Sequence, residues 1–397
     1  MNKRLLLMAI CLATTVPGGS FADDLTGVTA TEIKIGNTMP YSGPGSIYGT
    51  IGRTEAAYFH MLNDQGGING RKIGFVSRDD AYSPPKAVEQ TRKLIEEDGV
   101  AFMFGALGTP TSIAVRGYLN AKKVPQLLIG TGADQFLDPQ RFPWTLPYNP
   151  SYRVEAQIYA KYILRELPNA KVAILYQHDD FGRDYLKGLK DVLGDRYPKL
   201  VVKEESYEVS DPTVDSQMVS LQQSDADVLL LIAVAKQTAQ ALRKAHDLGW
   251  HPVIFIDLNS AFVPTLPGMA EISVGALSAL PYKDITDPSL ASDPDIIRFV
   301  EFAKKYLDSK AQRDPLALYG FGVAETMAQI LRQCGADLSR ANVMTQATNL
   351  KNFHSDNLLA GITVSSSPSD YRLIKRMRMS RFNGKFGELI GELIAAE

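Results

Sequence analysis

Cysteine is nearly absent from this sequence. Its 397 residues include two cysteines, Cys11 and Cys334, and Cys11 lies in an N-terminal apolar run. If that run is removed during export, one thiol remains and no internal disulfide can form. The mature fold must then be stabilised by its hydrophobic core alone, even in an oxidising compartment.

Neither sign of charge is in excess. The chain has 42 Lys and Arg against 44 Asp and Glu, and this balance gives no basis for binding nucleic acid or an anionic membrane surface. The sequence lacks Gly-x-Ser-x-Gly, His-Glu-x-x-His and any complete dinucleotide or P-loop fingerprint. Its five histidines have no metal-ligand spacing. We therefore expect no catalytic residue, no metal, no cofactor and no enzymatic activity.

The sequence also has no apolar run long enough to span a bilayer. The run Leu5–Val16 follows the basic pair Lys3-Arg4, and the small residues Ser20 and Ala22 come shortly after it. This order of charged region, apolar region and cleavage site is typical of a secretory signal peptide. We predict that residues 1–22 are a cleaved signal peptide and that the mature protein is periplasmic.

The rest of the chain alternates strand-like and helix-like segments. Short apolar runs such as Val100–Phe104 and Gln126–Ile129 are separated by amphipathic segments such as Pro84–Asp98. The alternation starts again after the turn-rich segment Pro143–Ser151, which we expect to be a linker. The pattern predicts two α/β units with parallel sheets. The tail, with its Asn383-Gly384 turn, is expected to form a hairpin.

Three turn-rich segments are expected to meet at one edge of the first sheet, where the strands end. They are Ser42–Tyr48, Ala106–Thr111 and Gly130–Asp134. In the second of them, Thr109 and Thr111 begin a helical pattern, where unpaired N–H groups and hydroxyls can bind an anion such as a carboxylate. An ordinary helix start with a threonine N-cap is the alternative.

Several motifs, taken in order, resemble those of leucine/isoleucine/valine-type periplasmic binding proteins. They are Ser42-Gly43-Pro44 with Tyr48-Gly49, the stretch Asn63–Arg71, Asp79-Asp80, and Asp180-Phe181-Gly182. The resemblance covers Thr31–Phe386. It implies two Rossmann-like lobes joined by three crossovers, which close on a ligand like a hinge. It also implies a monomeric extracytoplasmic receptor of an ABC importer, with a membrane permease and an ATPase as partners.

The resemblance also implies domain boundaries and site residues. Lobe 1 would hold residues 23–148 plus about 283–357, and lobe 2 about 149–282 plus 358–397. The ligand carboxylate would be held at the Leu107-Gly108-Thr109 turn, whereas the family's acidic anchor for an ammonium group falls near Asn259. A shift of one or two places would make Asp257 that anchor. The residues expected to bind ligand are Tyr48, Leu107, Gly108, Thr109, Gly132, Ala133, Asp134, Phe181, Asp257 and Asn259.

The departures from the family pattern bear on the ligand. Without an anionic anchor, a buried ammonium group would be unpaired, and this costs several kcal/mol. The family's disulfide is missing because Tyr82 and Gly108 take the cysteine positions, and Gly108 is expected to leave spare room beside Thr109. We therefore predict a small carboxylate, best an aromatic acid such as a benzoate or a phenylpropanoid, with an aliphatic keto acid possible. A hydrophobic amino-acid receptor and a sensing module for a signalling receptor are the alternatives.

Overall fold

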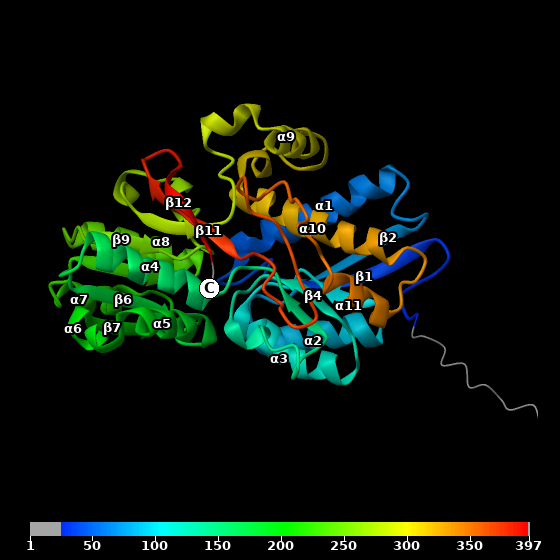
Figure 1. The fold of residues 1–397 in the computed structure, drawn as a ribbon, viewed down its shortest axis with the longest axis horizontal. Helices are drawn as coiled ribbons and strands as arrows, with labels where there is room; N and C mark the ends of the chain where they lie inside the picture. The colour runs from blue at the N-terminus through cyan, green and yellow to red at the C-terminus, as the bar shows by residue number, and fades with distance from the viewer. Residues whose placement is uncertain (1–24, 396–397) are drawn as a thin grey trace, which may run out of the picture.

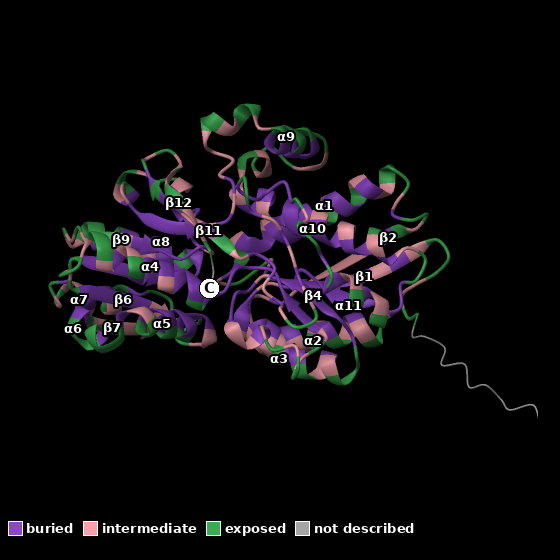
Figure 2. Cartoon of the chain, in the orientation of Figure 1, coloured by how far each residue is buried: buried purple, intermediate pink, exposed green. Residues whose placement is uncertain are grey.

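The computed structural model describes residues 25–395, in two α/β lobes side by side (Figure 1). The predicted signal peptide, residues 1–22, lies outside the described residues. Each lobe is built on one sheet, and strands of the two sheets do not mix. Buried residues fill the sheets and the helix faces against them, as Figure 2 shows. The predicted two-lobed fold with mainly parallel sheets is confirmed.

The first sheet has five parallel strands in the order β2-β1-β3-β4-β5. Its strands are β1 (Glu32–Met39), β2 (Lys72–Asp79), β3 (Phe102–Phe104), β4 (Gln126–Ile129) and β5 (Thr145–Pro147). The helices between them are α1 (Gly49–Asp64), α2 (Pro84–Glu96) and α3 (Thr109–Ala121). The strand β5 lies inside the segment expected to be a linker, so that expectation was wrong for three of its residues. Its proline is tolerated because β5 is an edge strand.

The second sheet has seven strands in the order β12-β11-β10-β9-β8-β6-β7. Its strands are β6 (Val172–Gln177), β7 (Val201–Tyr207), β8 (Val228–Ile232), β9 (Val253–Ile256), β10 (Leu277–Leu280), β11 (Arg376–Phe382) and β12 (Gly387–Ala395). Its helices are α4 (Tyr152–Glu166), α5 (Asp180–Leu193), α6 (Tyr197–Leu200), α7 (Asp215–Gln222) and α8 (Ala235–Asp247). Strands β6 to β10 run parallel, and β11 and β12 form the antiparallel hairpin expected at Asn383-Gly384.

Three further helices, α9 (Pro294–Tyr306), α10 (Pro315–Cys334) and α11 (Arg340–Ala347), belong to the first lobe. Apolar residues from Leu358 to Ile374 also join its core. The chain therefore returns to the second lobe nearer to Arg376 than to the expected boundary at residues 357–358. The reason is that this segment, although it contains no helix or strand, buries its leucines, isoleucines and valines on the first lobe.

Helix α10 packs against α1 through a glycine. A Cβ at Gly320 would lie 2.8 Å from the carbonyl oxygen of Ile51 on α1. Two residues further along α10, a Cβ at Gly322 would lie 2.2 Å from the side chain of Asn357. Close packing, rather than a phosphate cradle, was the favoured interpretation of this Gly-x-Gly, and the contacts confirm it. The packing brings the start of α10, and with it Tyr319, to the boundary between the lobes.

Candidate functional site

A continuous cavity lies between the two lobes. The first lobe lines it with residues before α1, with the turn before α3 and with the start of α10. The second lobe lines it with the loop after β9 and with parts of β10 and β11. Within residues 25–395, the charged side chains on its wall are those of Lys283 and Asp284, and most of the lining is apolar. Apolar walls with a few convergent polar groups are typical of a small-molecule site.

The turn before α3 presents hydrogen-bond donors to this cavity. Gly108 adopts a φ of 109°, a conformation that favours glycine, and lets the chain enter the helix at Thr109. The backbone N–H groups of Thr109 and Thr111 have no acceptor among residues 25–395, and Pro110 between them has no N–H. Thr131 Oγ1 lies 2.8 Å from Thr109 Oγ1 and accepts the N–H of Ala133. Thr131 can therefore donate its proton to Thr109, and the Tyr152 hydroxyl also interacts with both threonines.

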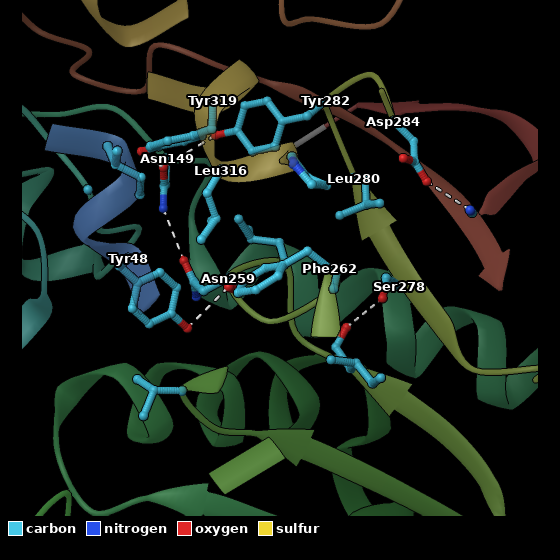
Figure 3. Close-up of a pocket in the computed structure, with 18 of the residues that line it drawn as sticks. Tyr48, Asn149, Asn259, Phe262, Ser278, Leu280, Tyr282, Asp284, Leu316 and Tyr319 are labelled. Atoms are coloured by element: carbon cyan, nitrogen blue, oxygen red, sulfur yellow. Dashed lines mark hydrogen bonds between the residues drawn. The ribbon is translucent and has the colours of Figure 1, made fainter. Parts of the chain in front are cut away.

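Two asparagines connect the lobes at the centre of the cavity (Figure 3). Asn149 Nδ2 donates to Asn259 Oδ1 over 3.1 Å, and Asn149 Oδ1 accepts the Tyr319 hydroxyl over 2.7 Å. The Tyr282 hydroxyl also donates to Asn149, and the Tyr152 hydroxyl donates to Asn259. Burial raises the pKa of these three phenols above the usual value, so they stay neutral. We call these five residues the amide relay.

Two carboxyl groups are buried behind the amide relay. Asp257 is fully buried; its carboxyl accepts the N–H of Ala233 and both the backbone N–H and the side-chain amide of Asn259. Burial raises the pKa of Asp257 to about 7. Glu155 of α4 accepts the N–H of Leu258, and burial, followed by the charge of Asp257, raises its pKa well above the usual value. Neither carboxyl lines the cavity.

Tyr48 spans the gap between the lobes. It belongs to the first lobe, yet its hydroxyl accepts the N–H of Ala235 over 2.9 Å and donates to the carbonyl oxygen of Asn259 over 3.2 Å. Both partners belong to the second lobe, and Ala235 is the first residue of α8. Tyr48 thus contacts the cavity with its ring while its hydroxyl holds the two lobes together.

Comparison with known proteins assigns this two-lobed arrangement to a family. The family profile described as "Periplasmic binding protein" matches residues 32–386. The chain belongs to this family of periplasmic binding proteins. Its members are extracytoplasmic solute-binding receptors, and the cavity between the lobes has the position of a receptor site. The helices among residues 25–395 include none with the length and apolar character needed to cross a membrane.

Individual relatives of this periplasmic binding protein are distant in sequence. The Leu/Ile/Val-binding protein homolog 7 of Brucella suis is 23% identical over 325 residues, covering 79% of each chain. A fatty acid ABC transporter substrate-binding protein from Thermomonospora curvata is 21% identical, with a TM-score of 0.77 over 94% of each chain. A solute binding protein from Rhodopseudomonas palustris BisB5, solved with 3,4-dihydroxy benzoic acid, is 16% identical, with a TM-score of 0.75 over 92% of this chain and 98% of that chain.

The structure brings six of the ten predicted site residues of this periplasmic binding protein to the cavity. These are Tyr48, Leu107, Gly108, Thr109, Phe181 and Asn259. The other four, Gly132, Ala133, Asp134 and Asp257, do not line it. Asp134 lies outside the cavity because its carboxyl accepts a hydrogen bond from the Ser151 hydroxyl at the first crossover. Asp257 lies outside the cavity because Asn259 covers it. Binding by the six that line the cavity stays a prediction.

The expectation of spare room beside Thr109 was wrong. A Cβ at Gly108 would lie 2.8 Å from Cε2 of the Tyr82 ring, so this ring already occupies the space. Tyr82 is 6% exposed and lines the cavity from the same side. Tyr82 and Gly108, which the resemblance places at cysteine positions of the family, therefore pack against each other, with the ring over the glycine.

Sequence reasoning did not identify most of the amide relay. Asn149 was assigned to a linker, and neither Tyr152 nor Tyr282 was proposed as a site residue. Tyr319 was considered only as part of a Gly-x-Gly packing motif. Each reaches the cavity from a crossover or from the start of a helix, and such positions depend on how the lobes pack. A crossover asparagine between tyrosine and proline, Tyr148-Asn149-Pro150, is the one local signal we find.

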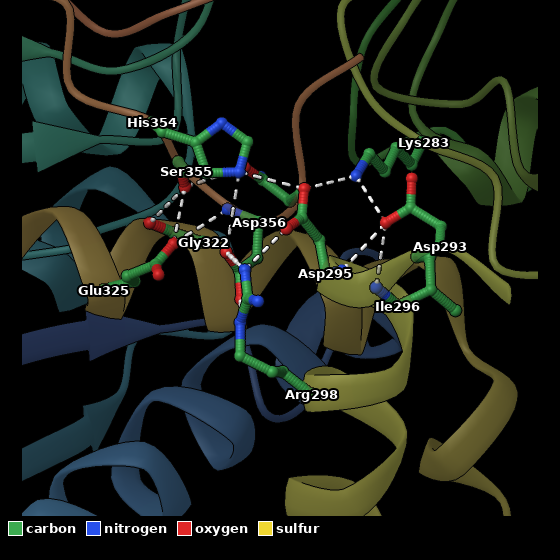
Figure 4. A network of polar contacts seen from close by, with 11 residues as sticks. Lys283, Asp293, Asp295, Ile296, Arg298, Gly322, Glu325, His354, Ser355 and Asp356 are labelled. Atoms are coloured by element: carbon green, nitrogen blue, oxygen red, sulfur yellow. Dashed lines mark hydrogen bonds and ion pairs between the residues drawn. The ribbon is translucent and has the colours of Figure 1, made fainter. Parts of the chain in front are cut away.

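A second polar network, on the first lobe, anchors the chain where it leaves β10 (Figure 4). Lys283 Nζ contacts Asp293 at 2.9 Å and Asp295 at 2.5 Å. Arg298 forms a two-pronged contact with Asp356 at 2.8 and 2.6 Å, and His354 contacts Asp295 at 2.9 Å. Asp295, His354 and Asp356 each have one side-chain atom that could ligate a metal, and these three atoms lie within 4.8 Å of one another. The lysine and the arginine already pair with these carboxylates, so the cluster is charge-compensated.

Replacing Lys283 by methionine is expected to lower the free energy of unfolding by about 2 kcal/mol. The Lys283 side chain is 5% exposed, and removing one partner from a buried ion pair leaves the other charge unpaired. The loss stays moderate because Arg298 and His354 still contact Asp295. Urea unfolding measures it, with Lys171→Met as the control. Lys171 pairs with an exposed carboxylate, and such pairs contribute less than about 1 kcal/mol. Equal losses in the two variants would contradict a stabilising role for this network.

Proposed function

We propose that this periplasmic binding protein is the receptor of an ABC importer for a small apolar carboxylate. Aromatic acids such as benzoates or phenylpropanoids are the preferred ligands in this proposal. The receptor would act as a monomer in the periplasm after cleavage of residues 1–22, deliver ligand to a membrane permease with its ATPase, and catalyse no reaction. Two structural relatives are compatible with this ligand class. One is named as a fatty acid transporter's substrate-binding protein, and the other was solved with 3,4-dihydroxy benzoic acid.

The turn before α3 supports the carboxylate. Thr109, which lines the cavity, has a free backbone N–H at a helix N-terminus, where the aligned peptide dipoles favour negative charge. The Thr109 hydroxyl adds a second donor. Leu107, the ring of Tyr82 and the ring of Phe181 supply apolar surface in the same cavity. Together these features suit a carboxylate attached to a flat apolar body.

The absence of charge in the amide relay is the main observation against an amino acid as the ligand. At the position expected to hold an ammonium group, the cavity presents the side chain of Asn259. The acid behind it, Asp257, already accepts three N–H groups from the protein. Asp284, the acidic side chain that does line the cavity, accepts the N–H of Gly387 in the second lobe. The second candidate is an amino-acid receptor of the same transporter class, because the relatives of this chain include Leu/Ile/Val-binding protein homologues.

A thermal-shift screen tests this proposal. A ligand that binds only the folded state raises the unfolding midpoint. We expect benzoates and phenylpropenoates to raise it, and leucine, isoleucine and valine to have no effect. Shifts with the amino acids alone would refute the aromatic-acid assignment while leaving the receptor class intact. Stimulation of the ATPase of a co-reconstituted permease by the liganded protein would separate transport from a purely sensory role.

Replacing Thr109 by alanine is expected to weaken binding of these acids by about 1–3 kcal/mol, because a buried acceptor loses its donor. Isothermal titration measures the dissociation constant. Thr109→Ser, which keeps the hydroxyl, should restore the affinity. Thr345→Ala is the matched control, because Thr345 lies exposed on α11. Since Thr109 also contacts Thr131, unfolding curves must show that the variant is folded. Unchanged affinity in folded Thr109→Ala would place the carboxylate elsewhere.

A further inference from the structure

The cavity continues beyond the amide relay along the second sheet. Alternate residues Ala276, Ser278 and Leu280, in and just before β10, line it. On the neighbouring strand β11, Ser380 is paired with Ser278, and Phe382 donates its N–H to the carbonyl oxygen of Ala276. These residues therefore share one face of the sheet. Figure 3 shows Ser278 and Asp284 on the side of the cavity opposite Tyr48 and Asn149.

Several walls of this part of the cavity are deeply buried. Ser278, Ser380 and Phe382 are 7%, 3% and 6% exposed, and Phe262, which faces them from the loop after β9, is 8% exposed. Pro264 of the same loop also lines the cavity. The walls of this part of the cavity are therefore mostly buried, and Leu280, Asp284 and Gly387 at its edge are half-buried. We call it the tail subsite.

The tail subsite makes the cavity longer than one aromatic ring. From Ala276 to Leu280 the strand advances four residues, which at ~3.3 Å per residue is about 13 Å. Thr109, where the proposed function places the carboxylate, lines the same cavity from the other lobe. A benzoate held at Thr109 would leave this extension unused. A longer acid would bury its body against Leu280 and Phe262, and burial of apolar surface favours binding.

The middle of the tail subsite is polar, because Ser278 lies between Ala276 and Leu280 and is paired with Ser380. Ser380 is almost fully buried, and its hydroxyl has no hydrogen-bond partner among residues 25–395. It lies against Gly387, where a Cβ would be 2.5 Å from Ser380 Oγ and 3.5 Å from a carboxylate oxygen of Asp284. Ser278 donates to the Ile256 carbonyl and keeps its lone pairs as acceptors. The hydroxyls suit a neutral polar group, and the nearby Asp284 disfavours a second carboxylate.

We propose that the ligand is an elongated monocarboxylic acid with a neutral hydrogen-bonding group, such as a hydroxyl, at the end distant from the carboxylate. Its apolar body occupies the tail subsite, and its distal group contacts Ser278 and Ser380. This inference rests on the proposed function for the position of the carboxylate. It adds the length of the ligand and the chemistry of its far end.

Isothermal titration with matched acids tests the inference. The long pairs are cinnamate with 4-hydroxycinnamate and octanoate with 8-hydroxyoctanoate; the short pair is benzoate with 4-hydroxybenzoate. We expect the long acids to bind more tightly than benzoate. The distal hydroxyl should lower the dissociation constant about fivefold to tenfold in at least one long pair, the range expected for one hydrogen bond, and leave the short pair unchanged. Equal affinities across all six acids would overturn the inference.

Two variants locate the effect. Ser380→Ala should abolish the preference for the distal hydroxyl without changing benzoate binding. Ala276→Leu should fill the tail subsite and weaken long acids about tenfold or more, because a packed site tolerates extra methyl groups poorly. Val274→Leu is the control, since Val274 is 62% exposed nearby and does not line the cavity. Equal weakening of short and long acids in Ser380→Ala would overturn the tail subsite.

The outcomes separate this inference from the proposed function. If benzoate binds and Thr109→Ala weakens it, but length and the distal hydroxyl have no effect, the carboxylate site stands and the tail subsite is refuted. If none of the acids binds, or if Thr109→Ala changes no dissociation constant, the proposed function itself fails and the inference fails with it. Ala276→Leu enters this comparison only if its unfolding midpoint shows a folded protein, and Ser380→Ala, a smaller change, carries the test otherwise.

Discussion

Replacing Gly132 by alanine is expected to destabilise the protein by about 3 kcal/mol. A Cβ at this position would lie 2.0 Å from the carbonyl oxygen of Pro150 and 2.9 Å from the ring of Tyr152. Gly132 also accepts the N–H of Tyr152 over 2.9 Å. Both neighbours belong to the first crossover between the lobes, so the backbone of the crossover would have to move. Overpacking of this kind costs about 1–3 kcal/mol and sometimes more, and a backbone contact places it at the upper end.

Gly117→Ala is the matched control for this experiment. Gly117 lies on α3, and a Cβ there would meet no heavy atom within 4 Å. Alanine is favoured over glycine in a helix by about 1 kcal/mol, so this variant should be slightly stabilised. Urea unfolding of both variants gives the comparison. If Gly132→Ala were as stable as Gly117→Ala, the first crossover would not be held against this turn, and the close approach that we assign to Gly132 would be incorrect.

Gly132 also shows why the sequence supports two interpretations of one residue. A glycine in a turn at a strand end can admit a ligand or admit another part of the backbone. The pattern of the chain favoured a ligand, because the turn follows β4 at the edge where ligands bind. The structure places the crossover there instead. Which backbone passes over a glycine is decided by tertiary packing, and a local sequence pattern contains no information on it.

The sheets themselves were predictable from periodicity. The strand β8 has five consecutive buried apolar residues, Val228–Ile232, as expected of a parallel strand covered on both faces. Short elements at the edges were harder to predict. The strand β5 has three residues and ends in proline, and the eight residues of α11 have a weak apolar pattern. Such elements form because the lobe around them supplies partners, so their own residues predict them poorly.

The candidate site was predictable where it follows strand ends and unpredictable where it follows crossovers. Thr109 begins the helix that follows β3, Asn259 lies in the loop that follows β9, and both line the cavity. Asn149, Tyr282 and Tyr319 come from two crossovers and from α10, and only the packing of the lobes brings them within hydrogen-bond distance. The contact between Tyr82 and Gly108 is another case, because it connects the segments that follow β2 and β3, two strands on either side of β1, through side-chain volume.

The stability of the wild-type protein relative to Asp257→Asn is expected to fall by about 4 kcal/mol as the pH rises from 4 to 8. Burial raises the pKa of Asp257 from 3.8 to about 7. Between these values the unfolded chain has lost the proton while the folded protein keeps it. The folded state is therefore penalised by about 1.4 kcal/mol for each pH unit, until Asp257 also ionises in the folded protein. Above pH 8 the difference should be constant.

Unfolding free energies of both proteins, measured at steps of one pH unit, give this difference directly. Asp225→Asn is the control, because the Asp225 side chain is 94% exposed, and the difference between wild type and this variant should vary little with pH. A difference between wild type and Asp257→Asn that is independent of pH would show that folding leaves the pKa of Asp257 unchanged, and one that grows with pH would show that the folded protein stabilises the ionised carboxylate. Either result would contradict the prediction.

The same titration distinguishes the two candidate ligand classes. An ammonium group placed at Asn259 would be attracted by ionised Asp257 behind it, so the affinity for an amino acid should rise as the pH passes 7. A carboxylic acid brings no positive charge to this position, and ionisation of Asp257 adds a negative charge behind the amide relay. Its affinity should therefore fall or stay constant over the same range. Because the proposed ligand has no ammonium group, we expect the second behaviour, and we expect Asp257→Asn to remove any fall.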